Sequence, residues 1–169
     1  LMMKKIAIIG GGASGLMAAD FLRHYPVQVS IYEAKPSVGR KFLLAGKGGM
    51  NITHSEEFAS FVNRYGAEKD FLQPMLEQFN NQAVRDWMQS LGFDSFVGSS
   101  GRVFPTDMKA APLLRAWLHR LRESGVKICA RHRWLGWTAE GNLRFATPEG
   151  EQQIAADAVI LACGGASWP

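Results

Sequence analysis

The stretch from Lys4 to Gly15, KKIAIIGGGASG, decides the fold of this 169-residue chain. It opens with a short apolar run, Lys5 to Ile9, of the kind found in a strand buried on both faces of a sheet. A glycine-rich turn follows at once, and residues 16–22 then have the composition of a helix. A second apolar run starts at Val27 and ends on the carboxylate of Glu33. This order predicts a strand, a helix and a second, parallel strand.

Gly10, Gly12 and Gly15 occupy the three glycine positions of a G-x-G-x-x-G pattern. In a dinucleotide site these glycines allow a tight turn, a close approach of the backbone to a pyrophosphate, and close packing of helix on strand. The N–H groups at the start of the helix favour an anion there. Glu33 is placed to accept hydrogen bonds from the adenosine ribose hydroxyls. Because strand, turn, helix and acid occur in order, a dinucleotide site is favoured over a plain turn.

Composition and charge indicate a globular protein with material for about one domain. Hydrophobic residues make up 47% of the sequence and the net charge is +4. The densest basic run, residues 115–133, favours a solvated helix face and strand edge over a nucleic-acid site, because no binding motif accompanies it. Cys129 and Cys163 lie in apolar runs without metal-ligand spacing, so we expect reduced, buried thiols, no metal site and a cytoplasmic protein. The sequence also predicts no membrane span and no signal peptide.

The segment after Glu33 predicts a ligand-binding loop. Residues 43–54, LLAGKGGMNITH, are rich in glycine and follow neither a helical nor a strand period. Glycines let a backbone pass close to a flat ligand. Arg40, Lys41 and Lys47 lie directly downstream of the predicted pyrophosphate site, and their charge complements phosphate. A binding loop is therefore favoured over an ordinary surface loop.

Residues 55–125 are predicted to be mostly helical. Apolar side chains recur at helical spacing between Ser55 and Leu91, and this pattern favours a buried core over cofactor contacts. The following residues carry the pattern: Phe58, Phe61, Val62, Tyr65, Phe71, Met75, Leu76, Phe79, Val84, Trp87, Met88 and Leu91. Asn80 or Asn81 is a candidate helix cap. Residues 93–105 suit an irregular hairpin, and Thr106 or Asp107 is a candidate cap for a helix that ends near Ser124.

Residues 126–169 are predicted to be mostly strand. A strand at 126–130 is followed by a three-stranded β-meander at 133–138, 143–147 and 152–155, with glycine in the turns between its strands. A further apolar strand, 157–162, runs into a second glycine turn at Cys163-Gly164-Gly165. Chain termini usually fall in dispensable surface segments, so a chain that stops in such a turn is expected to be a fragment.

Three stretches bring the sequence close to a known family. They are residues 39–54, residues 101–105 (GRVFP) and residues 160–169 (ILACGGASWP). With the first glycine motif and Glu33, they resemble the two-dinucleotide-binding flavoproteins of the glutathione-reductase superfamily. Within it they are similar to bacterial FAD-dependent oxidoreductases that include aminoacetone-oxidase-like proteins and proteins associated with bile-acid dehydroxylation. Many members carry an arginine-cysteine pair where Gly49 and Met50 stand, which suggests a different substrate preference here.

The resemblance implies an α/β fold: a Rossmann-type FAD-binding domain, a parallel sheet with helices, carrying a helical insertion and a three-stranded β-meander. Residues 1–54 would form the βαβ unit and flavin-side loop, residues 55–125 the insertion, and residues 126–169 the third strand, meander and second glycine turn; a substrate domain would be absent. FAD would be the cofactor. The residues implied to bind it are Gly10, Gly12, Ala13, Ser14, Gly15, Glu33, Ala34, Gly39, Arg40, Lys41, Gly46, Lys47, Gly48, Asn51, Trp134, Ala162, Cys163 and Gly164.

The expected function is the FAD-binding portion of an oxidoreductase whose full-length parent acts on a small organic substrate by hydride transfer. In flavoenzymes the cofactor carries the redox chemistry, so no catalytic residue is assigned. Lys47, Asn51 and His54 are the nearest candidates for tuning the flavin or handling a proton. NAD(P)H is a candidate electron source, and no nucleic-acid or membrane partner is expected. Two alternatives stay open: a nicotinamide-only dehydrogenase domain and a non-catalytic nucleotide-binding fragment.

Overall fold

The computed structural model describes residues 2–166, which divide into two compact units. Unit 1 is drawn from the two ends of the sequence, Leu1–Phe42 and Leu118–Pro169, and unit 2 from the middle, Leu43–Trp117. Ser167, Trp168 and Pro169, which belong to the third resembling stretch, lie outside the described residues. The three-segment division expected from the sequence stays a prediction.

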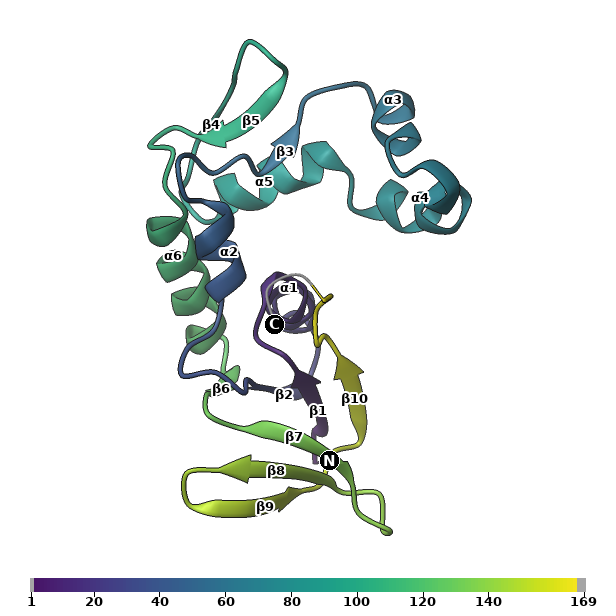
Figure 1. The fold of residues 1–169 in the computed structure, drawn as a ribbon, viewed down its shortest axis with the longest axis vertical. Coiled ribbons are helices and arrows are strands. Elements are labelled where there is room, and N and C mark those ends of the chain that lie inside the picture. The colour runs from purple at the N-terminus through teal and green to yellow at the C-terminus, as the bar shows by residue number, and fades with distance from the viewer. Residues whose placement is uncertain (1, 167–169) are drawn as a thin grey trace. The chain divides into compact units, whose positions relative to one another are not determined.

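A four-stranded sheet forms the centre of unit 1 (Figure 1). Its strand order is β10-β1-β2-β6, and all three neighbouring pairs are parallel. The bounds are β1 (Lys4–Ile9), β2 (Val27–Tyr32), β6 (Lys127–Cys129) and β10 (Ala158–Leu161). Helix α1 (Ala13–Leu22) links β1 to β2, so the predicted strand–helix–strand unit is confirmed.

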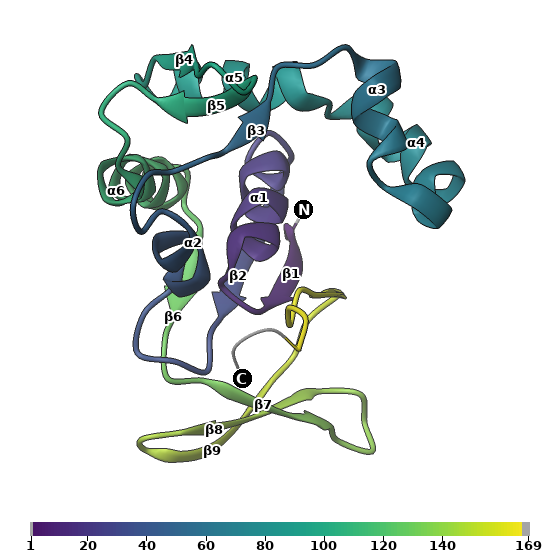
Figure 2. The ribbon, with the colours of Figure 1, turned by 45° about the horizontal axis from the view of Figure 1, so that its top comes forward.

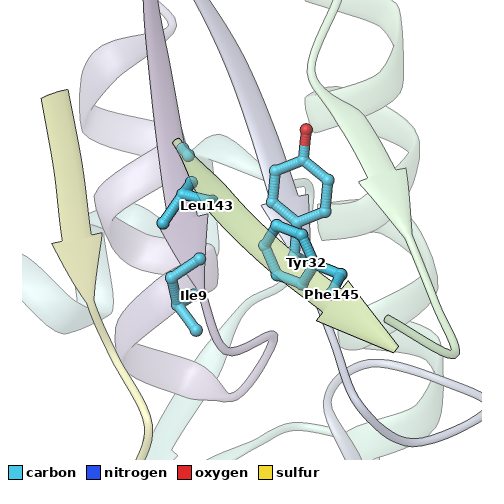
Figure 3. Close-up of a cluster of buried hydrophobic side chains, with 5 residues drawn as sticks. Ile9, Tyr32, Leu143 and Phe145 are labelled. Carbon is cyan, nitrogen blue, oxygen red and sulfur yellow. The ribbon is translucent and has the colours of Figure 1, made fainter. Parts of the chain in front are cut away.

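Side chains alternate across β1 and thereby give the sheet two packed faces. Ile8 is fully buried and faces α1: its Cγ2 lies 3.3 Å from a Cβ built on Gly15. Its neighbours Ala7 and Ile9 belong to a cluster with Tyr32 on the other side (Figure 3). The cluster is completed by Leu143 and Phe145 of the meander, which are 1% and 0% exposed.

The meander consists of β7 (Arg133–Trp137), β8 (Leu143–Thr147) and β9 (Gly150–Ile154), paired antiparallel in that order (Figure 2). The register of β7 on β8 shifts between Trp134 and Gly136. Phe145 stacks on Tyr32, the last residue of β2, with ring centroids 4.5 Å apart. The predicted meander is therefore confirmed, and it packs beside the carboxyl ends of β1 and β2.

A buried carboxylate ties α1 to α6 (Ala110–Glu123) within unit 1. Asp20 is 5% exposed; its Oδ1 accepts from Arg23 Nε at 2.7 Å and its Oδ2 from Arg120 NH2 at 2.5 Å. Arg120 was expected on a solvated helix face. The structure instead turns it inward, because a buried carboxylate needs a paired charge.

Replacing Asp20 with asparagine should lower the free energy of unfolding by about 3 kcal/mol, because it leaves two arginines without their counter-charge in a partly buried place. Urea unfolding monitored by circular dichroism measures this loss. Asp86→Asn is the control: its exposed carboxylate bonds only Gln82 on the same helix, and we expect a change within about 0.5 kcal/mol. Equal stability of the two variants would contradict the structural role given to Asp20.

Unit 2 combines short helices with a three-stranded antiparallel sheet, β3-β5-β4. Its elements are α2 (Arg40–Ala45, shared with unit 1), β3 (Thr53–His54), α3 (Phe58–Asn63), η1 (Gly66–Glu68), α4 (Lys69–Gln78), α5 (Asn81–Ser90), β4 (Ser95–Val97), β5 (Arg102–Pro105) and the first part of α6. Trp87 and Trp117 pack edge to face in its core, with ring centroids 4.6 Å apart. The predicted hairpin, the largely helical middle and the Asn80 cap are confirmed; Asn80 Oδ1 accepts from the Ala83 N–H.

Three local expectations were wrong. Residues 43–45, expected in the binding loop, form the end of helix α2, because leucine and alanine favour helix and Phe42 is buried. Helix α6 starts at Ala110 and not after Thr106 or Asp107, since Met108 adopts a left-handed conformation (φ 62°). Three apolar residues predicted as core are exposed: Phe71 and Met75 on α4, and Phe79 directly after it.

Candidate dinucleotide-binding site

Two of the motif glycines are enforced by close packing. A Cβ on Gly15 would lie 1.9 Å from the carbonyl oxygen of Gly10, so α1 meets the turn backbone to backbone. A Cβ on Gly10 would lie 2.1 Å from the carbonyl oxygen of Ala162, and Gly10 has φ +110°. Side chains rarely adopt that conformation. Gly15 thus allows α1 to pack against the turn, and Gly10 allows the turn to pack against the backbone just after β10.

Gly12 differs from these two. It is the N-cap of α1 with φ −81° and ψ −171°, a conformation open to any residue. Apart from its chain neighbours, no heavy atom of the described residues lies within 4 Å of a Cβ built on it. The folded chain therefore gives no steric reason for glycine here. The open space lies beside the first N–H groups of α1, which have no carbonyl partner within the helix.

The carboxylate of Glu33 is fixed by backbone donors on both of its oxygens. Its Oε1 accepts from the Gly11 N–H at 3.1 Å, and its Oε2 accepts from the Lys35 N–H at 2.9 Å. Its own carbonyl oxygen accepts from the His132 N–H at 2.8 Å. Glu33 follows β2 directly, as predicted, and one of its oxygens bonds to the glycine turn. Each carboxylate oxygen keeps a further lone pair for a ligand hydroxyl.

Sequence reasoning missed the role of Gly11. A Cβ there would lie 2.4 Å from Val38 Cγ1, and the carbonyl oxygen of Gly11 accepts from the Gly39 N–H at 2.7 Å. The segment after Glu33 is thus held against the glycine turn by its contacts with Gly11. The only signal in the sequence was the run of three glycines at positions 10–12, because the G-x-G-x-x-G pattern assigns no role to the middle one.

The other predicted residues of unit 1 line this region in different ways. Ala13, Ser14, Ala34, Arg40 and Lys41 are exposed, whereas Gly39 is buried. Arg40 NH1 lies 3.2 Å from Ser37 Oγ. Ala13 and Ser14 begin α1, and Ala34, Arg40 and Lys41 lie in the segment after Glu33.

The second glycine turn adjoins the first. Ala162 donates its N–H to the carbonyl oxygen of Ile9 at 2.8 Å, and Gly164 adopts φ +80°. Cys163 is exposed, which corrects the expectation of a buried thiol, since the strand ends one residue earlier at Leu161. Cys129 is half-buried, and burial raises the pKa of its thiol.

The start of the meander is locked to this region. His132 was expected to be exposed, yet it is half-buried beside Tyr32 and Phe145, with ring centroids 5.7 and 6.0 Å away. Its Nδ1 lies 2.7 Å from the carbonyl oxygen of Ala130. Trp134 is half-buried and packs against the same cluster.

The predicted flavin-side residues lie in unit 2. Gly46 is half-buried, where a Cβ would lie 2.4 Å from Ala110 Cβ, and Lys47, Gly48 and Asn51 are exposed. His54 uses both ring nitrogens locally: Nε2 lies 3.1 Å from the carbonyl oxygen of Ser100, and Nδ1 accepts from the Glu56 N–H. This geometry favours a structural role for His54, fixing the strand β3 to the turn before β5.

Two polar surface hollows of unit 2, of about 290 and 230 Å³, share Gln82 and Arg85. Several of their polar groups are already paired, since Arg85 Nε bonds Ser95 and Asn81 donates to the carbonyls of His54 and Glu56. Among residues 2–166, no group of three or more histidine, cysteine, aspartate or glutamate side chains is arranged to hold a metal ion. Within the same range, no helix has the length and apolar character that a membrane crossing requires.

Comparison with known proteins agrees with this geometry. The family model described as "HI0933-like protein Rossmann domain" matches residues 4–169. A 3-dehydro-bile acid delta(4,6)-reductase of Clostridium scindens is 36% identical over 168 residues, covering 96% of this chain and 39% of the relative. A ribosomal RNA dihydrouridine synthase of Haemophilus influenzae is 25% identical, covering 96% and 40%. The chain thus spans about two fifths of the length of these curated relatives.

Solved structures share the fold at low sequence identity. THI4 of Thermovibrio ammonificans superposes with a TM-score of 0.61 at 17% identity, over 96% of this chain and 58% of that one. The p-nitrophenol 4-monooxygenase PnpA of Pseudomonas putida gives a TM-score of 0.53 at 13% identity, over 94% and 40%. With the family match, they confirm the predicted Rossmann-type α/β fold.

Proposed function

The chain belongs to the HI0933-like family of Rossmann domains, and from this premise we propose that it is the FAD-binding portion of a flavin-dependent oxidoreductase. The observation that carries the proposal is the glycine turn at the start of α1. Gly10 and Gly15 are explained by contacts inside the chain, whereas the open space beside Gly12 leaves room for a ligand that approaches the backbone.

The residues present fit a dinucleotide. The pyrophosphate would bind over the first turn of α1, where the N–H groups of Ala13 and Ser14 and the positive end of the helix dipole favour an anion. Gly12 lets the phosphates come close, and the exposed Arg40 and Lys41 add positive charge. No acidic side chain lies in the first turn of α1 to oppose this charge.

Glu33 would accept hydrogen bonds from the ribose hydroxyls of the adenosine half. Its two backbone bonds hold the carboxylate in one orientation. A side chain fixed in this way loses little conformational freedom on binding, so each bond to the ribose contributes more to affinity.

The remaining predicted contacts are part of the proposal. Ala34 and Gly39 would flank the ribose and phosphate region, Trp134 would lie near the adenine, and residues 162–164 would close over the cofactor. Gly46, Lys47, Gly48 and Asn51 would serve the flavin ring. FAD, when bound, supplies the capacity to accept or donate a hydride. The chain's own residues bind and orient it.

The activity proposed for a full-length parent is oxidation or reduction of a small organic substrate by hydride transfer, with NAD(P)H as a candidate electron source. The relative from Clostridium scindens supports this proposal, since its name describes a reductase of bile-acid derivatives. A cytoplasmic location belongs to the same proposal.

Titration of the purified chain and of the full-length parent with FAD and with NAD tests the cofactor. We expect a saturable change in flavin fluorescence with FAD and no response to NAD. Binding of NAD in place of FAD by the parent would favour a nicotinamide-dependent dehydrogenase. Parent protein that binds neither nucleotide would overturn the proposed function.

Glu33→Gln should weaken FAD binding by the parent about tenfold, because a neutral amide replaces the charged acceptor of the ribose hydroxyls. Binding of FMN, which lacks adenosine, should stay unchanged, and isothermal titration calorimetry measures both. Glu149→Gln, in the turn between β8 and β9, is the matched control and should bind FAD normally. Normal FAD affinity in the Glu33 variant would remove Glu33 from the site.

A further inference from the structure

Met108 has a backbone conformation that methionine rarely adopts. Its φ is 62°, in the left-handed region, and among residues 2–166 Arg131 is the only other residue with a side chain that has a positive φ. The left-handed region costs free energy for a residue with a Cβ, and asparagine and aspartate enter it most readily. Strain of this kind persists where the surroundings fix the residue, and it is concentrated at ligand-binding and catalytic sites. The conformation of Met108 therefore points to a role at a site.

The neighbours of Met108 hold it in this conformation. Its N–H donates to the carbonyl oxygen of Pro105 at 2.9 Å, and Pro105 is fully buried at the end of β5. The carboxylate of Asp107 accepts from the Lys109 N–H at 3.1 Å. Two residues after Met108, Ala110 is 5% exposed at the start of α6. Met108 is thus fixed between two buried points of unit 2.

The strained residue contacts the flavin-side loop, residues 46–51, in two ways. Its carbonyl oxygen accepts from the Met50 N–H at 3.0 Å. Its Cε lies only 2.8 Å from a Cβ built on Gly49, so the methionine side chain fills the space that a side chain at position 49 would need. Gly49 has φ +128°, which residues with side chains rarely adopt. Gly49 and Met108 therefore fit each other, and the loop is held by both the backbone and the side chain of Met108.

The loop held in this way keeps groups that a ligand can use. Lys47 and Gly48 are exposed, and no heavy atom beyond the chain neighbours lies within 4 Å of a Cβ built on Gly48. The N–H groups of residues 46, 47 and 49–52 all donate to carbonyl oxygens of the chain. Within the described part of the chain, the Gly48 N–H has no such acceptor. The loop thus offers one exposed backbone donor next to a cation.

We propose that Met108 is a positioning residue for the flavin. Its strained backbone and its side chain hold the flavin-side loop in one conformation, so that the Gly48 N–H and the Lys47 ammonium are in place before the ring binds. A loop ordered in advance loses little freedom on binding, which raises affinity and fixes the ligand. The inference rests on the proposed function, because it needs a flavin beside the loop. Met108 acts through the loop and takes no part in the redox step.

Met108→Gly in the full-length parent tests the proposal. Glycine adopts the same backbone angles without strain, and it removes the side chain that lies over Gly49. The thermal unfolding midpoint of the apoprotein should stay within about 3 °C of the wild type, because relief of strain offsets the lost contact. FAD affinity should fall about fivefold, and the visible circular dichroism of the bound flavin should fall to about half, because the loop is no longer ordered in advance. Wild-type affinity and dichroism in this variant would overturn the proposal.

Three further variants separate positioning from a purely structural role. Met108→Leu keeps an apolar side chain over Gly49 and should restore the wild-type flavin dichroism. Arg131→Gly removes the other left-handed side chain (φ 55°) and is the matched control, which should leave the dichroism unchanged. An equal loss of dichroism in Arg131→Gly would assign the effect to strain in general and overturn the proposal. If Met108→Gly does not fold, Met108→Asn replaces it under the same criteria, since asparagine tolerates the left-handed region.

The same measurements distinguish failure of this inference from failure of the proposed function. A wild-type parent that binds no FAD would overturn the proposed function, and the role of Met108 with it. A wild-type parent that binds FAD, together with Met108 variants that match it in affinity and dichroism, would overturn the role of Met108 alone.

Discussion

A Gly12→Val variant should keep the fold and lose FAD. A Cβ at Gly12 meets no atom of the described residues beyond its chain neighbours, and the backbone angles there suit any residue, so we expect the folded chain to tolerate the change. The valine side chain fills the space through which a pyrophosphate would approach the start of α1. We expect FAD affinity of the parent to fall by about 100-fold or more, which corresponds to about 2.7 kcal/mol. Flavin retention on purification and titration of the apoprotein measure the loss.

Gly12→Ser separates the effect on the fold from the effect on the ligand. Serine is preferred over valine at a helix N-cap and stabilises the helix at least as well as glycine. Its thermal unfolding midpoint without cofactor should therefore equal or exceed that of the wild type. Its Cβ nevertheless enters the phosphate approach, so FAD should bind more weakly. Wild-type FAD affinity in either variant would contradict the phosphate site proposed here.

The fold around the glycine turn could be predicted because the signals were local. An apolar run, a glycine fingerprint and a second apolar run ending on Glu33 each specify one element, and short connections leave few ways to join them. The meander could also be predicted, from the alternation of side-chain types along its strands and from the glycines in its turns. The structure adds the contacts between distant residues, such as Gly10 with Ala162, which no local pattern encodes.

The site was harder to predict where a residue acts through its backbone. Gly11 donates its N–H to the Glu33 carboxylate and its carbonyl oxygen accepts from the Gly39 N–H, so Gly11 itself takes part through its backbone alone. Exposure was hardest of all. Helical spacing assigned Phe71, Met75 and Phe79 to a buried side, but spacing cannot say whether the chain itself covers that side. The predicted burial of Cys163 was wrong for a related reason, because the strand before it ends early, at Leu161.

Gly15→Ala should prevent stable folding. The added Cβ would lie 1.9 Å from the carbonyl oxygen of Gly10, a backbone atom that cannot move away by rotating a side chain. To accept the methyl group, α1 must separate from β1, which exposes Ile8 and Leu16, both fully buried. Overpacking and lost burial add together, so we expect destabilisation of more than about 4 kcal/mol, near the stability of many small domains. Solubility, circular dichroism and urea unfolding report the effect.

Gly10→Ala should destabilise the fold nearly as much as Gly15→Ala, for two reasons that a control variant can separate. Gly10 has both an unfavourable φ of +110° and a neighbour at 2.1 Å, whereas Gly141, in the turn between β7 and β8, has φ +84° and open space around it. Gly141→Ala therefore measures the conformational cost alone, about 1 kcal/mol. The excess loss in Gly10→Ala then measures the contact with Ala162, which joins the two glycine turns. Equal losses of stability at the two positions would show that this contact does not hold the ends of β1 and β10 together. Of the glycines in the G-x-G-x-x-G pattern, Gly15 alone would then be required by packing within the chain.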